Sequence, residues 1–126
     1  MKFKVVLPIL GFEDIKEFEL EEVNENFYTL KNEEKNITFT LVNPFFVRDY
    51  DFEISENEQK KLELDDNTKF LVLNILIVEN PFIESTINFA APLIFNLDKK
   101  TMGQVVLENS NYSLMEKLKD FIKSEK

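Results

Sequence analysis

Short apolar segments separated by turn residues make up most of this chain. Pro, Gly, Asn and Asp interrupt the apolar segments about every 8–12 residues, which is typical of all-β domains. We expect strands at residues 3–7, 18–23, 26–31, 36–42, 51–54, 70–78, 86–97 and 103–108. Helical signals are confined to residues 56–62 and to the segment that begins at Ser113. The pattern therefore predicts an all-β sandwich or small barrel with one or two short helices.

The two predicted helices begin with the same local signal. Ser55 is followed three residues later by Glu58, and Ser113 by Glu116, so each serine can form a capping box with its glutamate. The apolar residues with helical spacing after Ser113 are Leu114, Leu118, Phe121 and Ile122. We therefore expect the last element to be an amphipathic helix.

The apolar run at residues 85–97 is interrupted by polar residues and by a proline. Thr86, Asn88 and Asn96 lie within it, and Pro92 lies near its middle. A buried amide and a proline inside a strand both lower stability unless the structure uses them. We interpret the run as one long strand that bends at residues 90–92. Its polar side chains then either fix the bend by hydrogen bonds or contact a partner, and the sequence leaves both possibilities open.

The composition of the chain excludes several kinds of chemistry. Its 126 residues are expected to form a single domain, residues 1–126. They include no Cys and no His, which excludes disulfides and thiolate chemistry and removes the most common general base. No apolar run approaches the length of a membrane-spanning helix, and the first residues do not form a signal peptide. We therefore expect a cytoplasmic protein.

The charge of the chain narrows its possible partners. Acidic residues outnumber basic ones by 24 to 15, which gives a formal net charge of −9 at pH 7. Such a charge repels nucleic acids and anionic membranes, so we expect neither to be bound directly. It favours a basic protein partner, although the charge also suits a chain that only needs to remain soluble.

The sequence predicts no catalytic, cofactor-binding or metal site. Paired carboxylates such as those at residues 13–14 and 65–66 lie in turns, and residues 65–67 lack the ligand spacing of a calcium-binding loop. No histidine is present to activate a serine or threonine nucleophile. We therefore expect no enzymatic activity and no cofactor. The alternative is a small-molecule-binding β-barrel or hydrolase, in which carboxylates line a pocket together with Asn88 and Asn96.

Two segments are candidate sites for binding a protein partner. One follows the strand predicted at residues 36–42, where aromatic residues near the end of a strand are typical of interfaces. The other is the polar part of the bent run at residues 85–97. The residues that we expect to contact a partner are Asn43, Pro44, Phe45, Phe46, Thr86, Asn88 and Asn96. The alternative for the aromatic residues is that they fold back and close an end of the barrel.

Several short motifs occur in a fixed order between residues 7 and 112. They are Pro8-Ile-Leu-Gly-Phe-Glu13 followed by Phe18, Phe39 with Asn43-Pro44-Phe45, Asp49-Tyr50-Asp-Phe-Glu53, Thr86-Ile-Asn88 with Ala91-Pro92 and Asn96, Gly103-Gln104-Val-Val-Leu-Glu108, and Tyr112. Their order and spacing resemble the FliW family of flagellar assembly factors, although no single motif is specific. Ala90 departs from that pattern, since the family often has Lys at this position.

The resemblance implies a non-enzymatic regulator with a small antiparallel β-barrel-like fold. Members of the FliW family bind flagellin and also CsrA, an RNA-binding repressor of translation. While flagellin occupies the factor, CsrA is free to silence flagellin mRNA. After flagellin has been exported, the factor captures CsrA and translation resumes. The implied partners of this chain are therefore flagellin and CsrA, and an amphipathic helix of flagellin would require an apolar groove.

Overall fold

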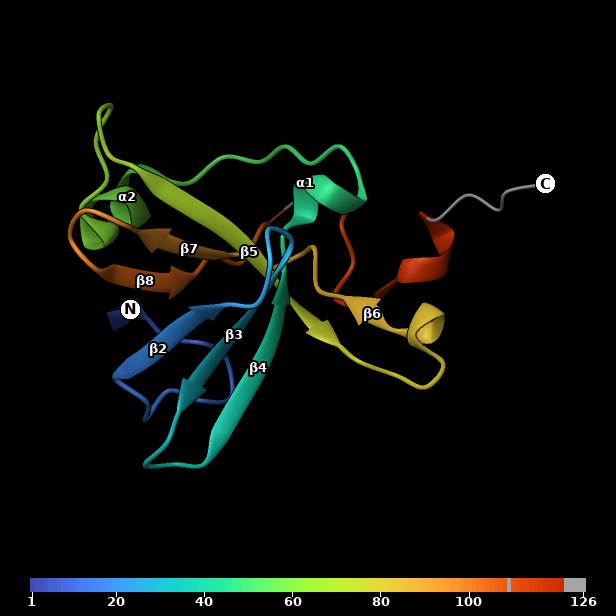
Figure 1. The fold of residues 1–126 in the computed structure, drawn as a ribbon. Coiled ribbons are helices and arrows are strands. Elements are labelled where there is room, and N and C mark those ends of the chain that lie inside the picture. Colours follow the sequence, from blue (N-terminus) through green and yellow to red (C-terminus); the bar gives the residue numbers. More distant parts are fainter. Residues whose placement is uncertain (109, 122–126) are drawn as a thin grey trace.

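The structure, a computed structural model, describes residues 1–108 and 110–121. Within these ranges, seven strands close into a barrel, with further short elements around it (Figure 1). The barrel strands are β1 (Lys2–Leu7), β2 (Glu17–Glu22), β3 (Phe27–Asn32), β4 (Ile37–Val42), β5 (Phe70–Ile77), β7 (Leu93–Asn96) and β8 (Thr101–Gln104). The other elements are the helices α1 (Pro44–Val47) and α2 (Glu56–Leu62), the 3-10 turns η1 (Phe82–Glu84) and η2 (Leu118–Asp120), and the short strands β6 (Thr86–Ile87) and β9 (Glu116–Lys117).

Pairing between β4 and β5 closes the barrel. The strand order is β4-β3-β2-β1-β8-β7-β5, and β5 then pairs with β4. Neighbouring barrel strands are antiparallel except β1 and β8, which run parallel with Lys4 opposite Thr101. Closure leaves the barrel strands without free edges over their paired lengths. The prediction of a small all-β barrel with short helices is thus confirmed, with one parallel pair added.

Two clusters of buried side chains lie on the two sides of the barrel wall. Alternate residues of β7 show why: Leu93 and Phe95 face into the barrel, whereas Ile94 belongs to the outer cluster. Phe3, Phe18 and Phe95 are at most 1% exposed, so side chains fill the interior. The outer cluster is covered by α2 near β7 and β8, and by α1 and the C-terminal segment near the other end of β5 (Figure 1).

Two of the strands expected from the sequence are absent or divided in the structure. Residues 51–54 form no strand, and the hydroxyl of Tyr112 binds the backbone N–H and C=O of Asp51, at 3.0 and 3.1 Å. The run at residues 85–97 is expected to be one strand bent at residues 90–92, but it divides into β6 and β7, which both pair with β5 and are separated by residues 88–92.

The helix expected from Ser113 onward is wrong over the described residues. The local signal does form, since the backbone N–H of Ser113 donates to the carboxylate of Glu116 at 2.7 Å. The chain then continues as β9, which pairs with β6, and η2 buries Leu118 against the outer core. Tertiary pairing therefore overrides the helical periodicity, and Ile122 lies outside the described residues.

The strand predicted at residues 103–108 is shifted, since β8 covers Thr101–Gln104, and the other predicted elements agree with the structure. Residues 56–62 form α2 with the capping box of Ser55 and Glu58, and β3 and β4 form the expected hairpin. The central strand β5 is buried over its middle and exposed at both ends. None of the helices among the described residues is long and apolar enough to cross a membrane.

Candidate functional site

Residues 43–46 form a compact knuckle directly after β4. The side chain of Asn43 accepts a hydrogen bond from the backbone N–H of Phe45 at 3.0 Å and so caps α1. Pro44 is buried at the first helical position, where its missing N–H costs nothing. This geometry leaves Phe45 and Phe46 57% and 58% exposed. Asn43 and Pro44 therefore shape the turn, and the two phenylalanines are presented to solvent.

The two phenylalanines of the knuckle face different hollows. The ring of Phe46 lies 6.2 Å from that of Phe27, which in turn lies 6.2 Å from that of Phe82. These rings border a groove of about 250 Å³, here called the apolar groove, lined by Phe27, Val42, Phe46, Val47, Leu76, Phe82, Ile87, Leu118 and Phe121. Phe45 instead lies 6.1 Å from Tyr50 and lines a separate hollow of about 430 Å³.

The composition of the apolar groove limits what it can bind. All of its lining residues are apolar, and its volume is below that typical of sites for drug-sized ligands. It suits one or two bulky side chains presented by a protein. Phe46 and Ile87 both line it, so the structure brings part of the first predicted segment next to β6, the strand that contains Thr86.

The bend at residues 88–92 is held by a network of buried polar groups. The side chain of Asn88 accepts from the backbone N–H of Ala91 at 3.0 Å. The amide of Asn74 donates to the backbone carbonyl of Asn88 at 2.7 Å and to the hydroxyl of Tyr50 at 3.2 Å. That hydroxyl donates to the carbonyl of Phe89 at 2.5 Å, and burial raises its pKa, which keeps the donor protonated. Asn88 therefore has a structural role.

Asn96 is also committed to the scaffold. Asn96 is fully buried, and its amide nitrogen donates to the carbonyls of Leu62 and Glu63 at 2.9 and 3.0 Å. Thr86 lies in β6 between β5 and β9, and its buried hydroxyl has no partner among the described residues. The seven predicted residues thus do not form one surface, and Phe45 and Phe46 are the exposed ones.

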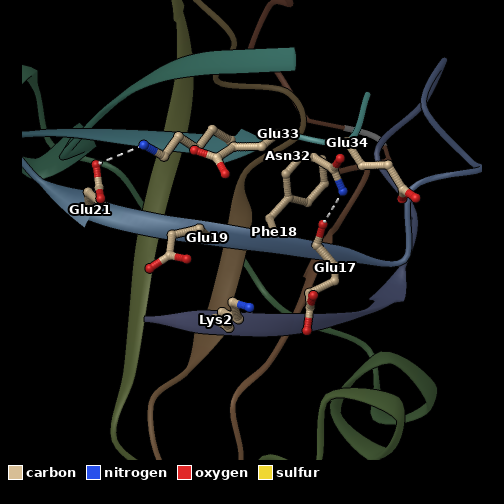
Figure 2. Close-up of a pocket in the computed structure, with 9 residues that line it drawn as sticks. Lys2, Glu17, Phe18, Glu19, Glu21, Asn32, Glu33 and Glu34 are labelled. Atoms are coloured by element: carbon tan, nitrogen blue, oxygen red, sulfur yellow. Dashed lines mark hydrogen bonds and ion pairs between the residues drawn. The ribbon is translucent and has the colours of Figure 1, made fainter. Parts of the chain in front are cut away.

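The outer face of β2 is acidic because of its alternating sequence. Phe18 and Leu20 face the barrel core, so Glu17, Glu19 and Glu21 point outward, as Figure 2 shows. They border a shallow hollow of about 350 Å³ whose other lining residues are Lys2, Phe18, Lys31, Asn32, Glu33 and Glu34. Lys31 pairs with Glu21 at 3.5 Å. The lining carboxylates outnumber the ammonium groups, which gives this face a net negative charge.

Arg48 is a further notable residue that the sequence analysis did not select. Its guanidinium group lies 2.8 Å from Glu116 and 5.1 to 5.5 Å from the ring centres of Phe89, Tyr112 and Phe121. It therefore joins the end of α1 to the C-terminal segment by an ion pair and cation–π contacts. One sequence signal was available, since Arg48 is the single arginine among 15 basic residues.

Comparison with known proteins places this geometry in a family. The model of the family described as FliW protein matches residues 2–118, which include every barrel strand, the knuckle and the acidic face. The chain belongs to the FliW family. One relative is flagellar assembly factor FliW 2 of Wolinella succinogenes, which is 48% identical over 99% of this chain and 95% of its own length.

Two further FliW proteins extend the comparison. Flagellar assembly factor FliW of Sulfurimonas denitrificans is 43% identical over 98% of this chain and 99% of its own length. A crystal structure of a flagellar assembly factor FliW superposes with a TM-score of 0.86 at 28% identity, covering 93% of this chain and 84% of that chain. The match therefore extends to the arrangement of the elements as well as to the sequence.

Proposed function

We propose that this chain is a flagellar assembly factor that acts as a single domain by binding other proteins and not by catalysis. In this proposal it binds flagellin, and it binds and antagonises CsrA when flagellin is absent, which relieves repression of flagellin mRNA. The observation that carries the proposal is the FliW match over residues 2–118, together with relatives of nearly equal length that have this name.

The apolar groove is the surface that suits flagellin in this proposal. An amphipathic helix binds by inserting apolar side chains into a hydrophobic groove. Here the exposed rings of Phe46 and Phe82 flank the half-buried ring of Phe27, and the floor is apolar. Aromatic residues at the centre of an interface commonly contribute most of its binding energy. We therefore assign the flagellin helix to this groove.

The acidic face of β2 is the surface that suits CsrA in this proposal. CsrA binds RNA, so it presents basic groups, and a face of opposite charge would attract it. The net charge of −9 also acts beyond direct contacts, because negative potential held near an RNA-binding surface opposes the approach of RNA. Glu17 is the residue of β2 that we expect to contribute most on this face, since Glu21 is paired with Lys31 and Glu19 lies 3.3 Å from the N-terminal ammonium group of Met1.

Calorimetric titration of the purified protein with flagellin and with CsrA tests the proposal. Phe46→Ser and Phe45→Ser form a matched pair, because the two side chains are equally exposed but line different hollows. Phe46→Ser should weaken flagellin binding at least about tenfold, as expected for loss of a central aromatic contact, whereas Phe45→Ser should change it little. No heat with either partner would contradict the proposed function.

The alternative of a ligand-binding barrel receives no support from the residues expected to line it. The barrel interior is filled by side chains such as Phe3 and Phe95, and the amide of Asn96 is used by backbone carbonyls. Asn88 holds the bend at residues 88–92. The structure therefore favours binding at the outer surface of the barrel.

A further inference from the structure

A second groove lies on the surface between residues 51–58 and 105–112, here called the edge groove. It has a volume of about 630 Å³. Its apolar lining residues are Phe52, Val105, Val106 and Leu107, and its carboxylates belong to Asp51, Glu53, Glu58 and Glu108. The two sides of the groove come from parts of the chain that are far apart in sequence. The hydroxyl of Tyr112 connects them, since it binds the backbone of Asp51.

One side of the edge groove is an open strand edge. Residues 105–107 continue β8, because the N–H groups of Val105 and Leu107 donate to the carbonyls of Pro92 and Ala90, each at 2.9 Å. On the other side of β8, β1 ends at Leu7, which is opposite Gly103. Residues 105–107 therefore extend beyond the end of β1, so β1 does not pair with their other edge.

The backbone of Val106 faces that uncovered edge. Successive residues of an extended segment point their N–H and C=O groups to opposite sides. Since the N–H groups of Val105 and Leu107 point toward Pro92 and Ala90, the N–H of Val106 points away from them. It has no hydrogen-bond partner among the described residues, and the side chain of Val106 is 48% exposed. Such an edge is a template for an added strand.

The charge of the edge groove selects the kind of segment that it can bind. Four of its lining residues are acidic and none is Lys or Arg, in contrast to the acidic face of β2, which includes two lysines. The acidic side chains of the described residues form no group of three or more that is suited to holding a metal ion. Cationic side chains of a partner are therefore the natural counter-charge.

We propose that the edge groove binds an extended segment of a partner protein in which lysine or arginine alternates with apolar residues. The main chain of this segment pairs with Val106, its apolar side chains lie on Phe52 and on the exposed side chain of Val106, and its cationic side chains face the four carboxylates. This surface is additional to the apolar groove and the acidic face of β2, and it differs from the apolar groove because it requires an extended conformation.

Fluorescence anisotropy with short labelled peptides tests this inference on the full chain. The probe is a capped six-residue peptide in which lysine and valine alternate. One control replaces a central valine with proline, which cannot donate to a strand edge, and a second replaces every lysine with glutamate. A third probe is a lysine-rich amphipathic peptide that is helical. The alternating peptide should bind at least about tenfold tighter than all three.

Variants of the chain locate the binding. Val106→Pro removes the N–H at the open edge without breaking an internal hydrogen bond. This substitution should weaken binding of the alternating peptide at least about tenfold. Val106→Thr keeps the N–H and should leave binding within about twofold. Glu53→Gln and Glu108→Gln should each weaken binding and reduce its salt dependence.

Two results would overturn the inference. One is equal binding of the alternating peptide and its proline control, and the other is equal binding of the helical probe. If Val106→Pro fails to fold by circular dichroism, hydrogen exchange of the Val106 amide in the wild-type chain gives the answer instead. Exchange there should slow when the alternating peptide is added, and unchanged exchange at saturation would contradict strand addition.

Discussion

Asn96 shows how one buried amide can join three elements. Its nitrogen donates to the last carbonyls of α2, and its oxygen accepts from the N–H groups of Asp98 and Lys99 in the turn between β7 and β8, each at 2.9 Å. The carbonyl of Leu62 also accepts from the hydroxyl of Thr101 at 2.7 Å, but the other groups would lose these hydrogen bonds if the side chain were removed. A buried polar group with all of its hydrogen bonds formed rigidifies its surroundings. If it loses one partner, the folded state is destabilised by the full desolvation free energy of the unpaired group.

Replacement of Asn96 should therefore reduce stability without a direct effect on binding. Asn96→Ala should lower the free energy of unfolding by about 1–3 kcal/mol, because buried backbone groups lose their partners. Chemical denaturation measures this value. Asn57→Ala is the matched control, since Asn57 is exposed in α2 and its loss should change stability by less than about 0.5 kcal/mol. Equal effects of the two variants would contradict the structural role of Asn96.

Tyr50 should make stability depend on pH in the alkaline range. Burial raises the pKa of its phenol in the folded chain above the ordinary value of about 10. The folded state thus holds this proton more tightly, so the stabilisation is fully present below about pH 10 and is lost as the pH rises above it. Denaturation at a series of alkaline pH values should show a steeper loss in the wild type than in Tyr50→Phe. Identical slopes would exclude this contribution.

At the scale of elements, the C-terminal segment is held in place by contacts from three directions. β9 pairs with β6, the backbone N–H of Leu118 donates to the carbonyl of Ser85 at 2.9 Å, and Glu116 pairs with Arg48. Glu116 is the more enclosed member of this pair, with 13% of its side chain exposed. The segment also supplies Leu118 and Phe121 to the apolar groove. Its position therefore determines the shape of that groove.

Loss of the Arg48 contacts should loosen this segment first. Arg48→Met keeps the apolar length of the side chain but removes the ion pair with Glu116 and the cation–π contacts, so residues 113–121 should exchange their amide hydrogens faster while the barrel strands change little. Hydrogen exchange followed by mass spectrometry measures this. Lys119→Met removes only the exposed pair with Glu84 and should have little effect. Uniform acceleration across the barrel would indicate global destabilisation instead.

The elements that can be predicted from the sequence are those with local causes. The capping box of Ser55 and the hairpin of β3 and β4 depend on neighbouring residues, and both form as expected. Residues 51–54 and the segment after Ser113 depend on contacts with distant parts of the chain. Tyr112 binds the first segment, and β6 pairs with the second. The periodicity of apolar residues along the sequence does not predict these tertiary contacts.

At the scale of the whole molecule, the barrel requires a close approach between its parallel strands β1 and β8. Gly103 faces Leu7 there, and a Cβ atom on Gly103 would overlap the Cβ of Leu7. Gly103→Ala should therefore lower the free energy of unfolding by about 1–3 kcal/mol, as overpacking does elsewhere. Thermal and chemical denaturation measure the change. In the background of Leu7→Gly the same substitution should cost less, and an equal cost in both backgrounds would contradict the proposed clash.

The net charge of −9 should govern how fast a basic partner associates. Electrostatic attraction accelerates encounter, and salt screens it over distances of about 8–10 Å at physiological ionic strength. The association rate with CsrA should therefore fall steeply as salt rises, whereas the dissociation rate should change less. Stopped-flow measurements at several salt concentrations test this, with Glu17→Gln expected to reduce the slope. An association rate that is independent of salt would mean that the acidity serves solubility alone.

Only part of the candidate surface can be predicted from the sequence. Phe46 is an aromatic residue next to a strand break, which is a local signal, and the structure places it at the apolar groove. The other walls of that groove come from β3, β4, β5, β6, η1 and the segment around η2, and the edge groove combines residues 51–58 with residues 105–112. Grooves of this kind arise only when the barrel brings distant segments together, so a linear pattern does not reveal them.

The pairing of β1 with β8 has a consequence for how this chain folds during its synthesis. Lys4 lies opposite Thr101, so β1 leaves the ribosome long before the strand with which it pairs. Closure is therefore a late and non-local step, which slows folding and leaves one side of β1 open in the nascent chain. Lys2 and Lys4 are charged residues on that strand, and charge on an open strand discourages pairing with other chains. We therefore expect Lys2 and Lys4 to disfavour mispairing of β1 while the barrel is incomplete.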